Sequence, residues 1–248
     1  MGEYDNTIIP FGTGVRVLTD QQEVFANVIH DLKSPLAVIT GLSEVFLRMM
    51  ATDLNDNQRE VIQKISRHAR FALDLIEDLL DIERLARGQL VLSKSSLDMK
   101  PFLDDIVQTH SIAGAEKGIR LELEAECNCV LETDERRLKE ILNNLLSNAL
   151  KYSHSRTTIL MTMLVEKKHC IISVKDQGIG IKEVEIERLF TPFAQLTNLP
   201  TGNEKSTGLG LSIVKNLIEL LGGSIAVSSV ENEGTTFTLK LPRSSEAR

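Results

Sequence analysis

The sequence predicts an α+β protein, in which a helical hairpin that forms a dimeric four-helix bundle precedes an α/β sandwich domain. Two long stretches before residue 88 repeat apolar residues at gaps of three and four, as amphipathic helices do. After residue 89 such stretches are mixed with short segments in which polar and apolar residues alternate, as in half-buried strands. Several of those segments are paired across short turns, so an antiparallel-rich sheet with helices on one face is expected.

The first long helix is expected to start at Thr19 or Asp20, either of which can serve as its N-cap, and to end near Met50. His30 falls opposite the apolar stripe of this helix, so its side chain is expected to face away from the bundle core. Residues 1–18 break the pattern and are interpreted as a linker or the remnant of an upstream module, with residues 15–18 able to end a strand. The stripe itself consists of Phe25, Val28, Leu32, Pro35, Ile39, Leu42, Phe46 and Met49.

A second helix follows the polar break at residues 52–56 and is expected to end near Arg87. His68 falls on its apolar stripe and is therefore interpreted as a core or interface histidine. One hairpin cannot bury so wide an apolar face alone, so residues 19–88 predict a homodimer with a four-helix bundle. The stripe consists of Val61, Ile65, His68, Ala72, Leu75, Leu79 and Ile82, and further apolar residues lie beside it at Ile62, Ala69, Ile76 and Leu80.

Residues 89–248 are predicted to form the second domain. Its helices are expected over Met99–Ala115, Asp134–Tyr152 and Ser212–Leu221, and the middle one carries the strongest apolar face. Strands are expected over residues 90–92, 120–124, 158–165, 170–175, 225–230 and 235–241, the last four as two hairpins.

Composition and charge exclude several classes of protein. No apolar run approaches the roughly 18 residues of a membrane span and the amino terminus does not resemble a signal peptide, so a cytoplasmic chain without a membrane span is expected. The net charge of −7 argues against nucleic acid as the main partner. Of the three cysteines two flank Asn128, and no second cysteine pair or histidine cluster completes a metal site.

The second domain carries a polar helix face that suits a nucleotide and its metal ion. Asn144, Asn148 and Lys151 are spaced by four and three residues, so they share the face opposite the apolar side of their helix. Amide oxygens suit a hard cation such as Mg²⁺, and an ammonium group suits phosphate.

Three further blocks follow in a fixed order. Asp176 precedes Gly178 and Gly180 at the end of a strand, where a carboxylate can accept from an adenine amino group and glycines let the backbone approach a ligand. The block at residues 189–193 anchors a long polar stretch, Thr197 to Thr207, that resembles a mobile lid. The last block, residues 208–211, opens a helix whose N–H groups can cradle phosphate. Together the blocks indicate a nucleotide site.

These blocks resemble those of the sensor histidine kinases of two-component signalling, over about residues 20 to 242. The segment from His30 to Leu36 is similar to their phosphoacceptor box, and residues 144–152 are similar to their asparagine box. The later blocks resemble the glycine and phenylalanine boxes of the ATP-binding domain shared with gyrase and mismatch-repair ATPases, and residues 234–237 resemble its closing glycine motif. Small departures occur where Asp31, Lys33 and Ser34 replace the commoner Glu, Arg and Thr, and Ser34 leaves phosphatase activity open.

The resemblance implies ATP-dependent autophosphorylation on His30, with Asp31 orienting its ring, and then transfer to an aspartate in the receiver domain of a response regulator. ATP and Mg²⁺ are the implied cofactors. The resemblance places Asn144 on the metal with help from Asn148, Lys151 and Tyr152 on the phosphates, and Asp176 on adenine. The remaining nucleotide contacts that it implies are at Gly178, Gly180, Thr207, Gly208, Leu209, Gly210 and Leu211.

Two alternatives belong to other classes. Glu140 lies four residues before Asn144, the spacing at which the gyrase-type relatives use Glu to activate water, so an ATP-hydrolysing enzyme is the first alternative. A dimeric scaffold whose ATP site only switches conformation is the second. The helical hairpin that carries His30 favours the kinase.

A strip of small side chains adjoins His30 and suits a protein partner. Ser34, Ala37 and Gly41 follow it at helical spacing, with Val38 beside them. The absence of long charged chains there would let a receiver domain approach closely, so this strip is the expected docking surface.

Overall fold

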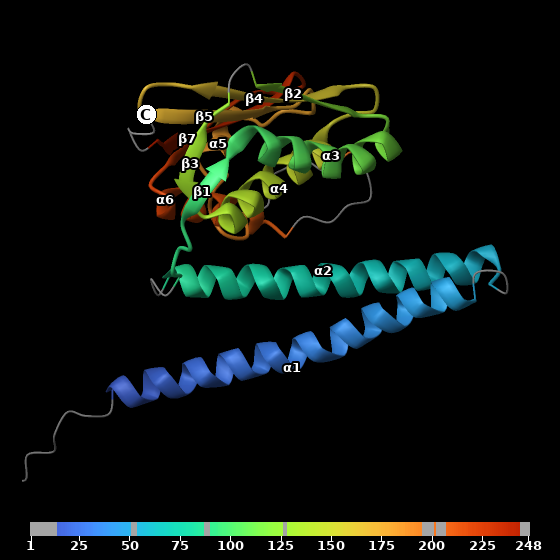
Figure 1. The fold of residues 1–248 in the computed structure, drawn as a ribbon. Coiled ribbons are helices and arrows are strands. Elements are labelled where there is room, and N and C mark those ends of the chain that lie inside the picture. The colour runs from blue at the N-terminus through green and yellow to red at the C-terminus, as the bar shows by residue number, and fades with distance from the viewer. Residues whose placement is uncertain are drawn as a thin grey trace, which may run out of the picture. The chain divides into compact units, whose positions relative to one another are not determined.

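In the computed structural model of this chain, the residues described are 14–50, 54–86, 90–125, 128–194, 201 and 207–243. The chain divides into two compact units, Met1–Glu77 and Asp78–Arg248, and Figure 1 follows their elements along the chain. The division falls within the second helix, whereas the expected domains are 19–88 and 89–248, and those limits remain a prediction.

The first unit contains a helical hairpin, as predicted. It is built by α1 (Gly14–Met49) together with α2 (Asp56–Ala86), which continues into the second unit. Because α1 begins at Gly14, the expected strand end at residues 15–18 is wrong. The predicted N-cap at Thr19 or Asp20 is wrong too, since both residues lie inside the helix. No glycine or proline interrupts residues 15–34, so the helical hydrogen bonding extends through this segment.

Several residues of the predicted apolar stripes are left exposed by the single hairpin, whereas Ala72, Leu75 and Leu79 of the second stripe are half-buried. Leu42, Phe46 and Met49 of the first stripe are 64%, 46% and 80% exposed. Val61 and Ile65 of the second are also exposed. Among the side chains of this unit that the structure describes, the buried ones are Ile29, Ser43, Ser66 and Ala69.

Most of these buried residues have small side chains, which is why the search for large apolar residues did not find them. The Ser43 hydroxyl donates to the Ile39 carbonyl at 2.7 Å, and the Thr40 hydroxyl donates to the Leu36 carbonyl at 2.9 Å. A hydroxyl that bonds to its own helix can be buried without losing a hydrogen bond. Three of the four buried residues are therefore small, with Ile29 as the fourth, and several large apolar side chains remain exposed in the single hairpin.

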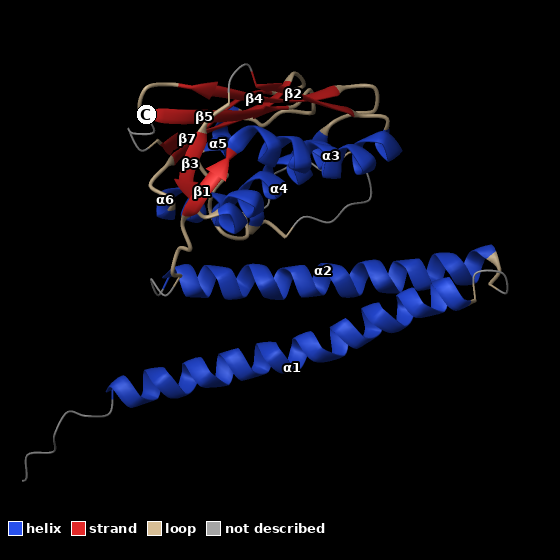
Figure 2. Cartoon of the chain, viewed as in Figure 1, coloured by secondary structure: helices blue, strands red, loops and turns tan. Residues whose placement is uncertain are grey.

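The second unit is built on a mixed five-stranded sheet, shown in red in Figure 2. Only the β2–β4 pair is parallel, and the other neighbouring strands are antiparallel. All the strands expected between residues 120 and 241 are present. In spatial order the strands are β2 (Arg120–Ala125), β4 (Thr158–Val165), β5 (His169–Lys175), β7 (Gly234–Pro242) and β6 (Ser224–Val230).

Three helices lie along one face of this sheet (Figure 2), as predicted, and close its core. They are α3 (Met99–Lys117), α4 (Glu135–Tyr152) and α6 (Gly210–Leu220), and the short α5 (Glu183–Ile186) adds one further turn. The expected inward face of α4 is confirmed, because its large side chains are fully buried. The core includes Leu138, Ile141, Leu142, Leu145 and Leu146 of α4, Ile159 and Met161 of β4, Ile172 and Val174 of β5, and Val214 and Leu217 of α6.

A second, two-stranded sheet differs from the prediction. It pairs β1 (Ser95–Asp98) with β3 (Val130–Thr133), whereas no strand forms at residues 90–92. The apolar run at 90–92 suggested a strand, but Val91 is 88% exposed and has no strand beside it among the described residues. The sequence of β1 contains a single apolar residue, Leu97, so alternation could not reveal it.

Among the residues that the structure describes, no helix has the length and hydropathy needed to cross a membrane.

Candidate nucleotide site and phosphoacceptor helix

A buried carboxylate lies at the end of β5. Asp176 is only 6% exposed, and its Oδ1 accepts from the backbone N–H groups of Gly178 at 2.9 Å and Thr235 at 3.1 Å. Burial raises the pKa of this carboxyl above its ordinary value of 3.8, although the two backbone bonds act in the opposite direction. Both of these bonds use Oδ1, so the site holds the carboxylate in one fixed orientation, as recognition of an amino group requires.

The two glycines after Asp176 allow the loop to lie directly against its neighbours. A Cβ at Gly178 would collide with the carbonyl of Tyr152, and one at Gly180 would collide with the carbonyl of Val230. Gly180 also has φ +62°, a conformation that other residues rarely adopt. This loop is joined to the end of α4 by the hydrogen bond from the Ile179 N–H to the Tyr152 carbonyl, at 3.2 Å.

Asn144 on α4 lies against the start of α6. Its Nδ2 donates to the Glu140 carbonyl at 3.1 Å, which fixes the direction of the amide. A Cβ placed on Gly210 would lie 2.6 Å from Asn144 Oδ1. The oxygen expected to bind a metal ion and the helix start expected to bind phosphate are therefore adjacent.

The turn before α6 is held by local hydrogen bonds. Thr207 Oγ1 accepts from the Leu209 N–H at 3.1 Å, and the Gly208 carbonyl accepts from the Phe193 N–H at 3.0 Å. The Leu209 side chain is 1% exposed and belongs to the core, so only its backbone can face a ligand. Leu211 is half-buried, and Thr207 is the last residue of the polar stretch that was expected to form a lid. Of that stretch, 197–207, only residues 201 and 207 are among those described.

The remaining predicted residues of α4 occupy its last turns. Asn148, Lys151 and Tyr152 are half-buried there. The structure thus joins Tyr152 to the loop after Asp176, and Asn144 to the start of α6. Among the described residues, no cluster of three His, Cys, Asp or Glu side chains could hold a metal ion.

Two residues of the site were not predicted. Thr235 orients Asp176 through its backbone N–H, and the sequence signal was the glycine motif at 234–237, which was assigned no role. Arg137 is 4% exposed and its Nη1 lies 2.7 Å from Glu140 Oε2. No pattern marked Arg137, because an arginine in the first turn of a helix is ordinarily solvated.

The segment expected to carry the phosphoacceptor, from His30 to Leu36, lies in α1. His30 is within the helix, but its side chain lies outside what the structure describes. The neighbouring Asp31 is exposed, Pro35 is accommodated within the helix, and Lys33 Nζ forms an ion pair with Glu77 Oε1 of α2 at 2.8 Å. The hairpin therefore presents residues 31–35 on or near its surface.

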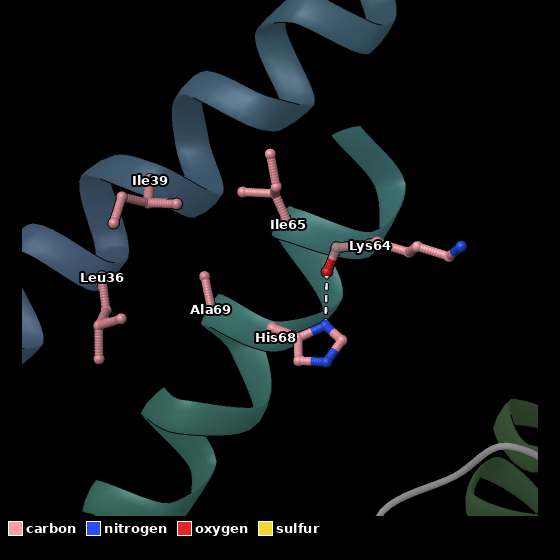
Figure 3. A pocket seen from close by; sticks show the side chains of 6 residues that line it. All are labelled: Leu36, Ile39, Lys64, Ile65, His68 and Ala69. Carbon is pink, nitrogen blue, oxygen red and sulfur yellow. Dashed lines mark hydrogen bonds between the residues drawn. The ribbon is translucent and has the colours of Figure 1, made fainter. Parts of the chain in front are cut away.

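The hairpin also has a pocket of about 500 Å³, shown in Figure 3. Side chains from both helices line it, and Ile39 and Ile65 among them are exposed. His68 is exposed at its edge, with Nδ1 2.8 Å from the Lys64 carbonyl oxygen, so that nitrogen carries the proton in this geometry. The lining consists of Leu36, Ile39, Lys64, Ile65, His68 and Ala69.

Comparison with known protein families agrees with both units. Residues 20–88 match the His Kinase A (phospho-acceptor) domain. Residues 133–245 match the histidine kinase-, DNA gyrase B- and HSP90-like ATPase domain. This order of a phosphoacceptor hairpin and an ATPase domain defines a histidine kinase. The chain belongs to the sensor histidine kinase family.

Individual relatives carry the same assignment. The circadian input-output histidine kinase CikA of Synechococcus elongatus is 35% identical over 228 residues, which cover 89% of this chain and 30% of that protein. The autoinducer 2 sensor kinase/phosphatase LuxQ of Vibrio cholerae is 33% identical over 225 residues, with 89% and 26% covered. The chain therefore spans less than a third of the length of these curated relatives.

A solved structure supports the fold. Full-length ShkA in complex with AMPPNP superposes with a TM-score of 0.75 at 26% identity, over 91% of this chain and 47% of ShkA. The histidine kinase AdeS of Acinetobacter baumannii gives a TM-score of 0.62 over 87% of this chain and 98% of AdeS, at 23% identity, and this likeness concerns the fold alone. The predicted α+β class, with a helical hairpin before an α/β sandwich, is thus confirmed.

Proposed function

We propose that this chain uses ATP to phosphorylate itself on His30 and then passes the phosphoryl group to an aspartate in the receiver domain of a response regulator. The observation that carries the proposal is the convergence of the sequence blocks in the second unit. Asp176 is fixed by Gly178 and Thr235, and Asn144 lies at the start of α6. These are the parts of an ATP site in a family whose hairpin supplies the acceptor.

Each predicted contact has a chemical role in this arrangement. The second oxygen of Asp176 accepts from the adenine amino group, while the loop at Gly178 and Gly180 lets the base approach the backbone. Lys151 and Tyr152 donate to phosphate oxygens. The backbone of residues 207–211 surrounds the phosphates with N–H groups at the positive end of α6. The nucleotide-contacting residues of this last segment are Thr207, Gly208, Leu209, Gly210 and Leu211.

Asn144 and Asn148 fit a magnesium ion carried with the triphosphate. An octahedral Mg²⁺ ion accepts one or two oxygen ligands from protein and the rest from phosphate and water. When bound, it would neutralise negative charge on the phosphates and so favour attack at phosphorus. Asn144 Oδ1 is the first ligand that we assign, with Asn148 in support.

The transfer itself requires little from the protein beyond positioning. A neutral ring nitrogen of His30 attacks the γ-phosphorus, the bond from that phosphorus to the bridging oxygen breaks, and ADP leaves with the bonding electrons. With an unperturbed pKa of about 6.5, most histidine is already neutral near pH 7. Asp31 accepts the N–H of the other ring nitrogen and so orients the ring. The aspartate of the regulator then attacks the phosphohistidine.

A hydrolytic role for Glu140 is less well supported. A base that activates water needs a carboxylate whose oxygens are open to that water. Glu140 Oε2 is instead 2.7 Å from the guanidinium of the buried Arg137. The match of the hairpin to a phosphoacceptor domain also disfavours hydrolysis, because a hydrolase needs no such hairpin.

The exposed apolar face of the hairpin supports a homodimer. Ten large apolar side chains of the described hairpin are at least two-fifths exposed, and two of them line the pocket in Figure 3. A second hairpin would cover those that belong to the predicted apolar stripes and complete a four-helix bundle. The ten are Leu32, Val38, Ile39, Leu42, Val45, Phe46, Met49, Met50, Val61 and Ile65.

The small-residue strip supports the assignment of a regulator surface. Ser34, Ala37 and Gly41 are exposed, and Val38 beside them is 56% exposed. Nothing lies within 4 Å of a Cβ built on Gly41, so the strip has open space in front of it. A receiver domain could therefore bring its aspartate close to the helix that carries His30.

One experiment tests the proposed activity against the alternatives. The protein is incubated with γ-labelled ATP and magnesium, and the label is followed on protein and in free phosphate. We expect label on the protein that is labile in acid and stable in alkali, as a phosphoramidate is. Release of free phosphate without labelled protein would support the hydrolase instead, and ATP binding without either product would support the conformational switch.

A further inference from the structure

All four of the last carbonyls of α4 accept hydrogen bonds. The final four carbonyls of a helix have no partner within the helix and need donors from elsewhere. In α4 the first of them accepts from the residue that caps the helix, and the other three accept from other parts of the unit. Ala149 accepts from the Ser153 N–H at 3.0 Å, Leu150 from Lys117 Nζ at 2.9 Å, Lys151 from the Thr201 N–H at 3.0 Å, and Tyr152 from the Ile179 N–H at 3.2 Å.

Thr201 makes the most extensive of these contacts. Besides its N–H, its hydroxyl lies 2.9 Å from the Lys151 carbonyl and 2.8 Å from the Ser153 carbonyl. The single hydroxyl proton is shared between these two acceptors. Thr201 itself is exposed, so these bonds hold it to α4 without burying its side chain.

We propose that Thr201 is a positioning residue for the phosphate-binding part of the nucleotide site. Its two donors fix the turn from which Lys151 and Tyr152 reach the phosphates. The inference rests on the proposed function, because it assigns those two side chains to ATP.

The hydrogen bonds from Thr201 to the Lys151 carbonyl also change the electrostatic potential at the end of α4. The carbonyl end of a helix carries negative partial charge, which repels phosphate near it. The N–H and O–H of Thr201 both point at the Lys151 carbonyl and offset that charge. Thr201 therefore makes the end of α4 more compatible with a triphosphate. The carboxylate of the adenine pocket, Asp176, is held by its own bonds from Gly178 and Thr235, so we expect it to depend less on Thr201.

Thr201 lies in the sequence between two residues that are joined by their backbones, since the Phe193 N–H donates to the Gly208 carbonyl at 3.0 Å. Gly208 precedes the start of α6 by two residues.

The test compares two variants in the full chain. Thr201→Val keeps the shape and the N–H but removes the hydroxyl, and Thr201→Ser keeps the hydroxyl. Thr109→Val is the matched control, since Thr109 also donates its hydroxyl to a carbonyl, that of Asp105 at 2.8 Å, but on the exposed side of α3. Dissociation constants for ATP, ADP and adenosine are measured with magnesium, and thermal unfolding is measured without nucleotide.

We expect Thr201→Val to weaken ATP and ADP binding by about three- to tenfold, the fold-change for loss of one net hydrogen bond. Adenosine binding should fall less than ATP binding, the unfolding temperature should fall no more than in Thr109→Val, and Thr201→Ser should bind ATP as the wild type does. The inference is overturned if Thr201→Val binds ATP normally, if adenosine binding falls equally, or if Thr201→Ser is as weak as Thr201→Val. A wild-type chain that binds no ATP would overturn the proposed function as well.

Discussion

The two units of this chain bury their apolar residues to very different extents. In the second unit, Leu142 and Leu145 of α4 are 0% exposed, and the sheet and helices close around them. In the first unit, Leu42 and Met49 of α1 are 64% and 80% exposed. Each large apolar side chain left in water forgoes about 1.5–3 kcal/mol of stabilisation. The second unit is therefore a complete fold in one chain, and the hairpin is not.

The same contrast appears in the chemistry. The nucleotide residues are fixed by backbone hydrogen bonds, as those to Asp176 show, whereas the acceptor segment lies on a helix with Asp31 and Ser34 exposed. Phosphoryl transfer needs an enclosed donor site and an acceptor that can be reached by two different partners in turn. For the proposed function, an acceptor whose neighbours Asp31 and Ser34 are exposed suits contact first with the ATP domain and then with a regulator.

The largest expected effect is a loss of phosphorylation that leaves ATP binding intact, so it distinguishes the role of the hairpin from that of the second unit. His30→Gln should abolish phosphorylation of the protein, because the attacking nitrogen is lost, while ATP binding by the second unit should be unchanged. Labelled ATP measures the first quantity and nucleotide titration the second. Phosphopeptide mapping that places the label of the wild-type protein on His68 or elsewhere would show that the acceptor is misassigned.

Next in size is the effect on the regulator surface. Ala37→Arg places a long charged chain on the exposed strip and should reduce transfer to a receiver domain severely, while labelling of the kinase itself continues. Gly41→Ala is the control, since a Cβ there meets nothing within 4 Å and should have little effect. Transfer from Ala37→Arg at the wild-type rate would place the docking surface elsewhere.

Assembly should depend on the exposed apolar face of the hairpin. Phe46→Glu puts a charge where a second hairpin would cover an apolar ring, which costs several kcal/mol and should weaken dimerisation about a hundredfold or more. Sedimentation velocity over a concentration series measures this. Gln63→Glu, a charge at an exposed polar position of α2, is the matched control. A wild-type chain that remains monomeric at micromolar concentration would contradict the bundle.

A smaller effect is expected at the adenine site. Asp176→Ala removes one charge-assisted hydrogen bond worth roughly 1.5–3 kcal/mol, so ATP affinity should fall about ten- to hundredfold. Asn144→Ala should instead reduce magnesium-dependent turnover more than adenine binding. Unchanged ATP affinity of Asp176→Ala in a titration would exclude Asp176 from the base pocket.

Asp176 also predicts a pH dependence of stability without nucleotide. Because burial raises the pKa of its carboxyl above 3.8, the charged form is disfavoured in the folded state. The contribution of this carboxyl to the free energy of unfolding is most favourable below pH 3.8, and it is lost as the pH rises through the raised pKa. Asp176→Asn should therefore gain in unfolding free energy relative to the wild type as the pH increases. Denaturation at a series of pH values measures the difference, and a constant difference would contradict it.

The sequence predicted the second unit better than the first, and the reason is physical. In α4 the apolar residues are the buried ones, so periodicity alone located its inner face. In the hairpin, three of the four residues described as buried are the small Ser43, Ser66 and Ala69. A search for large apolar residues cannot find such positions, and it selected several residues that the single hairpin leaves exposed, among them Leu42 and Val61.

The site shows a similar division. Residues that contribute a side chain, such as Asn144 and Asp176, could be predicted because their chemistry is visible in the sequence. Contacts made by the backbone could not, since the N–H of Thr235 or of Thr201 is the same in any residue except proline. The β1–β3 pair was missed for a related reason, because its stability comes from pairing and not from an alternating pattern.

The smallest expected effect distinguishes transfer from hydrolysis. Glu140→Gln keeps the shape of the side chain and an oxygen that can accept from Arg137, so self-phosphorylation should change by about threefold or less, equivalent to under 1 kcal/mol in the barrier. If Glu140 were instead the base that activates water, its loss would lower ATP turnover by about 10²–10⁴-fold. Single-turnover labelling of the protein and release of free phosphate are measured together, with thermal unfolding as the control for the loss of a charge beside Arg137. If both rates fell strongly while the unfolding temperature stayed unchanged, Glu140 would be a catalytic residue. The main reaction would then be ATP hydrolysis in the second unit and not transfer to His30.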